Sequence, residues 1–240
     1  MNIFQKGFNY SQDGPGNRLV YHLKGCNMHC PWCSNPEGMS TSVGTYTVMT
    51  PSELVSEAIS SKPMFFDGGG VTFTGGEATQ QSVELAEVLR GLSENGINTA
   101  METNGTYRQL GDLFCWIDHL MIDFKHPLSE RHKRFTGLPN DVVKDNIRLA
   151  IAKEKDLLVR IPFIGGVNND RESIDGFLDF FKSLDTDRFR VEILPYHEYG
   201  KDKWEKCGLP YAMQHAFVSE DERTKFEQQL MAIGVAVIRT

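Results

Sequence analysis

Three cysteines that lie close together are the residues of this 240-residue chain whose types and spacing best suit chemistry. Cys26, Cys30 and Cys33 occur in the segment CNMHCPWC, with the spacing CxxxCxxC, whereas Cys115 and Cys207 are distant and isolated. An odd number of cysteines, behind an N-terminus without the apolar core of a signal peptide, argues against a disulfide framework. Three thiolates on one short loop can instead converge on a single metal centre.

This spacing leaves two kinds of metal centre open. A structural zinc site takes four protein ligands, and the candidates for a fourth, His22 and His29, are poorly spaced for it. An iron–sulfur cluster normally takes four cysteines, so a cluster held by three would leave one iron able to bind another molecule. An open iron of that kind is a catalytic position rather than a simple electron-transfer position.

Segments of strand length alternate with longer segments of helical spacing along most of the chain. The strand-length runs are rich in Val, Ile, Leu and Phe without strict polar alternation, which is typical of strands buried on both faces. They cover residues 18–25, 70–74, 97–103, 119–125, 157–163 and 189–195. The helical runs follow Thr50 and cover residues 82–95, 107–117, 142–155, 171–184 and 220–233.

Two of these helices have well-defined boundaries in the sequence. Thr50 can cap the first one, because Pro51 suits its first turn and Glu53 occupies the capping-box position. The helix over 82–95 has its apolar residues on one face, and Gly96 is a suitable stop. That inward face consists of Leu85, Val88, Leu89 and Leu92.

The alternation predicts an α/β fold. Six strand–helix repeats imply parallel strands with right-handed crossovers, as in a doubly wound sheet or a barrel of (β/α) units. A complete eight-unit barrel takes about 250 residues, and six units with a long first loop leave too little of this chain for eight. We therefore expect a single domain over residues 1–240 that forms a partial (β/α)6 TIM-like open barrel.

Glycines and polar residues follow the strands at the ends where a barrel carries its functional residues. Gly75-Gly76-Glu77 is either a plain turn or a backbone that a ligand can approach closely. Asp123 and Lys125 point the same way on a strand, so they suit ribose hydroxyls and a carboxylate, or they form an ion pair with each other. The remaining strand ends carry Glu102, Arg160 and His197.

The triplet and the strand ends together resemble the radical S-adenosylmethionine superfamily. CxxxCxxC with an aromatic residue before the last cysteine is similar to its cluster-binding signature, and Gly75-Gly76-Glu77 is similar to its GGE motif. The segments DGPGNR at 13–18, LPYHE at 194–198 and GKDKW at 200–204 resemble, more specifically, the activating enzymes of glycyl radical enzymes. The resemblance implies one 4Fe-4S cluster whose open iron binds S-adenosylmethionine, and cleavage of that cofactor to a radical that abstracts a hydrogen atom.

The resemblance also implies roles for individual residues. The catalytic set would be Cys26, Cys30 and Cys33, which hold the cluster, and Asp13, which orients the glycine-bearing loop of a partner. Asp13 before Gly-Pro-Gly equally suits a turn. The residues implied to line S-adenosylmethionine are Trp32, Cys33, Ser34, Gly75, Gly76, Glu77, Glu102, Asp123, Phe124, Lys125, Arg160 and His197.

The chain departs from the pattern of that branch at several places. Glu102 stands where its best-known members have Asp beside a monovalent cation, and a longer carboxylate is expected to alter or abolish that cation site. Ser34 stands where a His is common in that branch, directly after the third cysteine. About 35 residues separate Cys33 from Gly68, so we expect no ferredoxin-like insert with further cysteines. Cys115 is expected to be a buried core thiol and Cys207 to lie alone in a loop, which predicts a single cluster.

Composition limits the partners. The 25 Lys and Arg against 32 Asp and Glu give a net charge of −7 and a pI near 5.5, which argues against nucleic acid. No apolar run approaches the roughly 20 residues that span a bilayer, so we expect no membrane association and a cytoplasmic location. We also expect a monomer. A basic segment at 125–134 stands out in this acidic chain, as a solvated helix face or as a docking site for an acidic electron donor or partner.

The leading hypothesis is an enzyme of anaerobic metabolism that takes a hydrogen atom from a backbone glycine of a partner glycyl radical enzyme. Reduced flavodoxin or ferredoxin would supply the electron. The first alternative is a radical enzyme with the same core that acts on a small molecule or peptide. The second is a zinc-binding or iron–sulfur regulatory module without catalysis.

Overall fold

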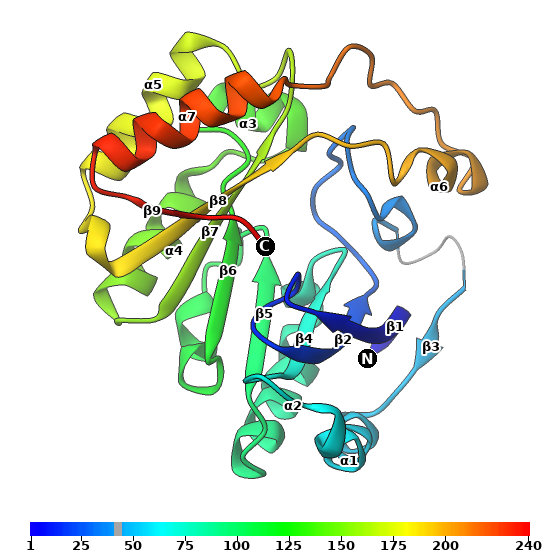
Figure 1. The fold of residues 1–240 in the computed structure, drawn as a ribbon. Helices are drawn as coiled ribbons and strands as arrows, with labels where there is room; N and C mark the ends of the chain where they lie inside the picture. Colours follow the sequence, from blue (N-terminus) through cyan, green and yellow to red (C-terminus); the bar gives the residue numbers. More distant parts are fainter. Residues whose placement is uncertain (41–44) are drawn as a thin grey trace. The chain divides into compact units, whose positions relative to one another are not determined.

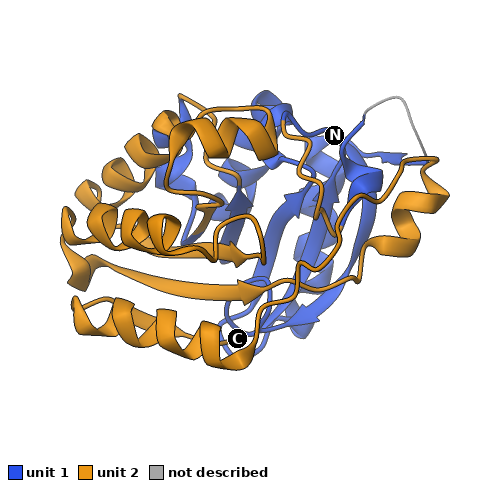
Figure 2. Ribbon diagram, turned by 90° about the horizontal axis from the view of Figure 1, so that it is seen from above, with its two compact units in different colours: residues 1–27, 35–103, 109–120 blue, residues 28–34, 104–108, 121–240 orange. Residues whose placement is uncertain are grey.

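The structure is a computed structural model, and it describes residues 1–40 and 45–240. It divides into two compact units that interleave along the chain (Figure 2). Unit 1 consists of residues 1–27, 35–103 and 109–120, and unit 2 consists of residues 28–34, 104–108 and 121–240. That both form one functional domain stays a prediction.

Unit 1 is built on a mixed sheet with the strand order β3-β1-β2-β4-β5. β1 (Asn2–Tyr10) and β2 (Asn17–Leu23) form an antiparallel hairpin, and β3 (Thr47–Val48) pairs with the start of β1. β4 (Gly70–Gly75) lies parallel to β2, and β5 (Thr99–Thr103) lies parallel to β4. The sheet of this unit is therefore open, with parallel strands from β2 onward.

The start of α1 and both ends of α2 lie where the sequence predicts, to within one residue. Thr50 forms a complete capping box with Glu53 at the start of α1 (Pro51–Ser61). α2 (Ser82–Glu94) buries its four predicted leucine and valine side chains, and Gly96 follows it with φ +63°. The shorter 3-10 helices of this unit are η1 (Pro36–Gly38), η2 (Lys62–Met64), η3 (Ala78–Gln81) and η4 (Leu110–Trp116).

Unit 2 carries a second open set of parallel strands. β7 (Asp156–Phe163), β8 (Phe189–Pro195) and β9 (Ala236–Ile238) lie side by side (Figure 1). β6 (His119–Asp123) begins in unit 1 and ends in unit 2. The helices are α3 (Ser129–Thr136), α4 (Asp141–Ala152), α5 (Arg171–Lys182), η5 (Thr186–Arg188), α6 (Lys201–Lys206) and α7 (Glu220–Ala232).

Aromatic side chains fill the core of unit 2. Phe124, directly after β6, packs against Phe177, Phe180 and Phe181 of α5, with ring centroids 5.0–6.0 Å apart. Phe226 of α7 contacts Phe177 at 5.7 Å. These rings are buried and remove a large apolar area from water, so they fix the strand ends that carry polar residues.

The expected fold class is confirmed: the chain is α/β, and all six predicted strands are present as β2, β4, β5, β6, β7 and β8. β1 was not predicted, because its sequence NIFQKGFNY is polar, contains Gly7 and is largely exposed. The helix expected over 107–117 is wrong, since the segment forms the 3-10 helix η4 instead. Gly111 and Asp112, both poor helix formers, lie in that segment.

Candidate functional site

Cys30 and Cys33 lie on a tight loop of unit 2. The Cys33 N–H donates to the Cys30 carbonyl at 3.1 Å, and the His29 N–H donates to the Thr136 carbonyl at the end of α3 at 3.0 Å. The Trp32 ring lies against Phe135, with centroids 6.1 Å apart. This loop is thus fixed to α3 by its backbone and by an aromatic contact.

The segment after β8 closes over the same loop. The Trp204 indole Nε1–H donates to the Cys33 carbonyl at 2.9 Å. A Cβ at Gly200 would lie 2.6 Å from the Cys33 carbonyl oxygen and 2.8 Å from the Ser34 Cα, so this position requires glycine. The GKDKW segment therefore has a physical role: it packs directly on the backbone of Cys33 and Ser34.

Cys26 belongs to unit 1, directly after β2. Gly25 precedes it with φ +102°, and its N–H donates to the Gly38 carbonyl at 2.8 Å. The Cys26 N–H donates to the Met39 carbonyl at 3.0 Å. The backbone at Cys26 is thereby held against η1 and the residue that follows it.

The donor set fits a cluster in its chemistry. All five cysteines lie in the described part of the chain, and none is in a disulfide. Three thiols within eight residues match three ligands of a 4Fe-4S cluster. Among residues 1–40 and 45–240, however, no three His, Cys, Asp or Glu side chains are gathered as a ready metal site. The ligand assignment rests on residue type and spacing, and it stays a prediction.

Of the two other cysteines, Cys115 does not lie where it was expected. Cys115 is exposed on η4, so the prediction of a buried core thiol is wrong. The 3-10 geometry turns Leu113 and Phe114 inward instead, and their side chains fill the core. Cys207 is the C-cap of α6 and is partly exposed.

The turn after β4 in unit 1 is very closely packed. A Cβ at Gly76 would lie 2.3 Å from the Gly25 carbonyl oxygen and 2.4 Å from that of Gly38. The Gly76 N–H donates to the Leu23 carbonyl at 2.8 Å, and the Glu77 N–H donates to the Gly25 carbonyl at 2.7 Å. The glycine at 76 is therefore required by contact with the segment that leads into Cys26.

Two carboxylates of unit 1 lie near the ends of β4 and β5: Glu77 follows β4, and Glu102 is within β5. Glu77 is 1% exposed, and its Oε1 accepts from the Thr79 N–H at 3.0 Å, the Thr79 hydroxyl at 2.6 Å and the Thr103 hydroxyl at 2.7 Å. Glu102 Oε2 accepts from the Thr74 hydroxyl at 2.7 Å. Both side chains bind hydroxyls of the neighbouring strand end. A cation near Glu102 stays a prediction.

A buried arginine that was not predicted as a site residue organises the loop of Asp13. Arg18 is 0% exposed and donates to the Pro15, Gly68 and Val71 carbonyls and to the Thr72 hydroxyl. Burial lowers its pKa to about 10, which leaves it charged at neutral pH. The Asp13 carbonyl accepts from the Thr72 hydroxyl at 2.7 Å. The arginine of the DGPGNR segment thus holds the loop that presents Asp13.

Asp123 and Lys125 form an ion pair at 2.5 Å at the end of β6. Their side chains are 18% and 11% exposed, so the pair is mostly buried. Between them, Phe124 points its ring into the aromatic core, and its N–H donates to the Arg160 carbonyl at 2.8 Å. Any role of Phe124 at a cofactor would therefore use its backbone.

Arg160 lies within β7, and His197 lies in the segment after β8. Arg160 is 4% exposed and its Nε donates to Glu192 Oε2 at 2.9 Å. His197 stacks on Tyr199, with centroids 4.1 Å apart, and its Nδ1 accepts from the Tyr199 N–H at 3.3 Å. Burial lowers the pKa of His197, which favours the neutral imidazole.

The basic segment of unit 2 is largely buried or paired. It consists of Lys125, His126, Arg131, His132, Lys133 and Arg134. The two histidines are at most 1% exposed. Arg131 is paired with Asp170 at 2.9 Å and with Glu172 at 2.8 Å. Lys133 and Arg134 remain exposed on α3, so the segment offers a much smaller cationic surface than its sequence indicates.

The three cysteines at CxxxCxxC spacing follow the first parallel strand of an α/β fold, and polar residues lie near successive strand ends. Residues 20–178 match the sequence model of the Radical SAM superfamily, and the chain belongs to that superfamily. The pyruvate formate-lyase-activating enzyme of Staphylococcus epidermidis is 31% identical over 222 residues, which cover 89% of this chain and 88% of that protein. The chain is a radical S-adenosylmethionine enzyme related to these activating enzymes.

Solved structures support the same relationship. A domain of a pyruvate-formate lyase-activating enzyme from Bacteroides vulgatus is 30% identical, with a TM-score of 0.58 over 71% of this chain and 98% of that one. A radical SAM methyltransferase from Sphaerobacter thermophilus has a TM-score of 0.69 over 96% of this chain and 67% of that one, at 16% identity, which shows a shared fold. Superfamily membership implies an iron–sulfur cluster and S-adenosylmethionine, so the hypothesis of a non-catalytic module is set aside.

Proposed function

We propose that this chain is an activating enzyme that installs a radical on a backbone glycine of a glycyl radical enzyme. The observation that carries the proposal is the 31% identity to a pyruvate formate-lyase-activating enzyme across nearly the full length of both chains. When bound, the cluster would deliver one electron to S-adenosylmethionine, whose cleavage to methionine and a 5′-deoxyadenosyl radical allows removal of the glycine hydrogen atom.

The proposal assigns roles to the residues that the resemblance singles out. Cys26, Cys30 and Cys33 would ligate the cluster. In unit 1, the Gly75-Gly76-Glu77 turn and Glu102 would face the methionine part of the cofactor, and Asp13 would orient the partner's loop. In unit 2, the residues proposed to bind S-adenosylmethionine are Trp32, Ser34, Asp123, Phe124, Lys125, Arg160 and His197.

The side chains of this protein would bind and orient S-adenosylmethionine, and they would not themselves react. The Asp123–Lys125 pair offers a carboxylate for ribose hydroxyls and an ammonium for the cofactor carboxylate. Trp32 is held by Phe135, and Trp204 donates to the Cys33 carbonyl, which fixes the wall on which an adenine would lie. Reduced flavodoxin or ferredoxin as the electron donor, and a cytoplasmic monomer in anaerobic metabolism, belong to the same proposal. None of the helices in the described residues is long and apolar enough to cross a membrane.

The direct test is radical transfer. The protein is reconstituted anaerobically with iron and sulfide, reduced, and mixed with S-adenosylmethionine and purified pyruvate formate-lyase. We expect about four irons per chain, formation of 5′-deoxyadenosine and a glycyl radical doublet by electron spin resonance. A pyruvate formate-lyase whose radical glycine is replaced by alanine should give no doublet.

Matched cysteine variants control for the ligand assignment. Cys30→Ala should abolish iron uptake and cofactor cleavage, whereas Cys207→Ala should retain both. Cleavage of S-adenosylmethionine without a doublet on any glycyl radical enzyme, together with turnover of a small molecule or peptide, would instead favour the alternative substrate class.

A further inference from the structure

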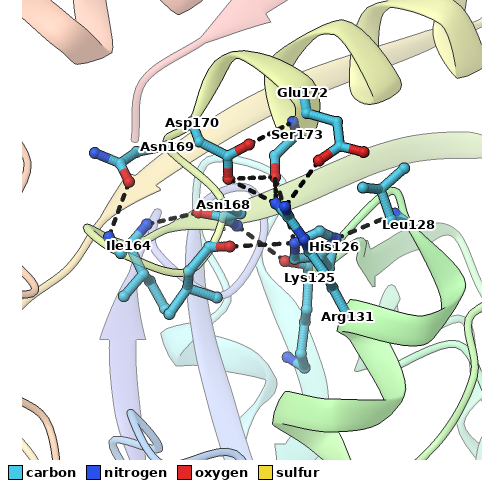
Figure 3. Close-up of polar contacts among 12 residues, drawn as sticks. Lys125, His126, Leu128, Arg131, Ile164, Asn168, Asn169, Asp170, Glu172 and Ser173 are labelled. Atoms are coloured by element: carbon cyan, nitrogen blue, oxygen red, sulfur yellow. Dashed lines mark hydrogen bonds and ion pairs between the residues drawn. The ribbon is translucent and has the colours of Figure 1, made fainter.

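The ends of β6 and β7 are joined by one buried amide side chain. The Phe124 N–H donates to the Arg160 carbonyl at 2.8 Å. Beyond that bond, Asn168 Nδ2 donates to the Lys125 carbonyl at 2.9 Å (Figure 3). It also donates to the Pro162 carbonyl at 2.7 Å. The amide therefore joins the two strand ends just beyond a backbone hydrogen bond between them.

Asn168 is well suited to this place. Its Oδ1 accepts from the Ile164 N–H at 2.8 Å, and its side chain is 0% exposed. An amide of this size offers two N–H donors and an acceptor, whereas an ionised aspartate offers acceptors alone. The Asn168 side chain is fully buried, so losing one of these hydrogen bonds leaves a buried amide group unpaired.

A second buried side chain ties the same two loops together. His126 Nδ1 accepts from the Leu128 N–H at 3.1 Å, so its proton lies on Nε2, which faces the Val167 carbonyl at 3.1 Å and the Ser173 hydroxyl at 3.4 Å (Figure 3). The Ser173 hydroxyl donates to Asp170 Oδ2 at 2.8 Å. These hydrogen bonds fix the loop after β7, and they therefore fix the position of Asn168 relative to Lys125.

We propose that Asn168 is a positioning residue for S-adenosylmethionine binding. It sets the place of Lys125 relative to Arg160, because it holds the backbone carbonyl of Lys125 and that of Pro162, two residues beyond Arg160. This inference rests on the proposed function, in which Lys125 and Arg160 bind the cofactor. Asn168 itself touches the backbone, and it acts through Lys125.

The test compares two neighbouring asparagines on the same loop. Asn168→Asp removes both donors at nearly constant volume, and Asn168→Ala removes the whole amide. The control is Asn169→Ala, because Asn169 accepts from the Gly166 N–H at 2.8 Å and donates to Glu222 of α7 at 3.0 Å, so these two hydrogen bonds join its own loop to α7. The measurement is the Kd of S-adenosylmethionine on the reconstituted, unreduced enzyme, by calorimetry, with iron content measured on the same samples.

We expect the Kd to rise about tenfold in both Asn168 variants at unchanged iron content, and to stay at the wild-type value in Asn169→Ala. If Asn168→Ala does not fold, Asn168→Ser, which keeps one donor, should give a smaller rise. A wild-type Kd in the Asn168 variants, or an equal rise in Asn169→Ala, would overturn the positioning role alone. A wild-type protein that binds iron but no S-adenosylmethionine would overturn the proposed function and this inference with it.

Discussion

Arg160 and Glu192 form a buried ion pair between β7 and β8, in which the Arg160 Nε donates to Glu192 Oε2 at 2.9 Å. Their side chains are 5% and 2% exposed. Glu192 Oε1 also accepts from the Thr240 N–H at 2.9 Å and from its hydroxyl at 2.5 Å. A charge pair so far from water depends on both partners, since either one alone would be a buried, uncompensated charge.

Removing the Glu192 carboxylate should therefore strongly destabilise the protein. We expect Glu192→Ala to lower the free energy of unfolding by about 3 kcal/mol or more, because it strands the Arg160 guanidinium. Asp145→Ala, at the exposed Arg148–Asp145 pair of 3.1 Å, should cost less than about 0.5 kcal/mol. Urea unfolding of both variants measures these losses. Equal losses of stability would show that burial does not make the Arg160–Glu192 pair more important than an exposed pair.

The Asp123–Lys125 pair allows its two interpretations to be separated. If the pair binds the cofactor, Lys125→Met should raise the Kd of S-adenosylmethionine by about tenfold or more, since a charged hydrogen bond to the ligand is lost. If it is only a structural ion pair, the variant should lose stability while the folded protein binds the cofactor as before. Lys6→Met, at the 2.6 Å pair with Glu57 in unit 1, is the control that should leave the Kd unchanged.

The close approach at Gly76 predicts a steric effect of a single methyl group. Gly76→Ala would force a Cβ against two backbone oxygens that cannot rotate away, so we expect the thermal midpoint to fall on the order of 10 °C. Gly7→Ala places its Cβ in open space and should change the midpoint by no more than about 2 °C. Similar midpoints for the two variants, measured by circular dichroism, would show that the turn can rearrange.

Local signals in the sequence predicted much of this fold. The Thr50–Glu53 capping box and the apolar face of α2 depend on residues within one or two helical turns, and such patterns are visible in a single sequence. β1 was missed because a mostly exposed strand of a hairpin has no apolar periodicity. Its pairing with β2 depends on a partner strand rather than on its own composition.

The site residues divide in the same way. The cysteine triplet and the Asp123–Lys125 spacing are local, so the sequence could indicate them. Asn168 could not be predicted, because the two carbonyls it binds belong to residues 6 and 43 positions away. Glu192 lies in a strand-length run, and nothing near it in the sequence indicates that it pairs with Arg160, which is 32 positions earlier. Polar contacts between residues so far apart in the sequence can be identified only once the fold is known.

Two buried histidines of unit 2 should make the protein sensitive to acid. Burial lowers the pKa of His126 and of His132 to about 4, from an ordinary value near 6.5. His132 Nδ1 lies 2.5 Å from the Leu138 carbonyl and so carries the proton, while its buried Nε2 has no hydrogen-bond partner among the described residues. Protonating Nε2 would create a charged donor without an acceptor, and the folded state resists this.

The sign of the pH dependence follows from these values. Between about pH 6.5 and pH 4 the unfolded chain binds a proton at each histidine and the folded chain does not, so stability decreases as the pH falls through this window. Each histidine contributes a slope of up to about 1.4 kcal/mol per pH unit. His132→Asn, whose amide can still donate to the Leu138 carbonyl, should be less stable at pH 7 but should lose less stability between pH 7 and pH 5. Urea unfolding of the wild-type protein and of His132→Asn at pH 7, 6 and 5 gives the two slopes, and a wild-type slope in His132→Asn would show that His132 does not titrate with unfolding.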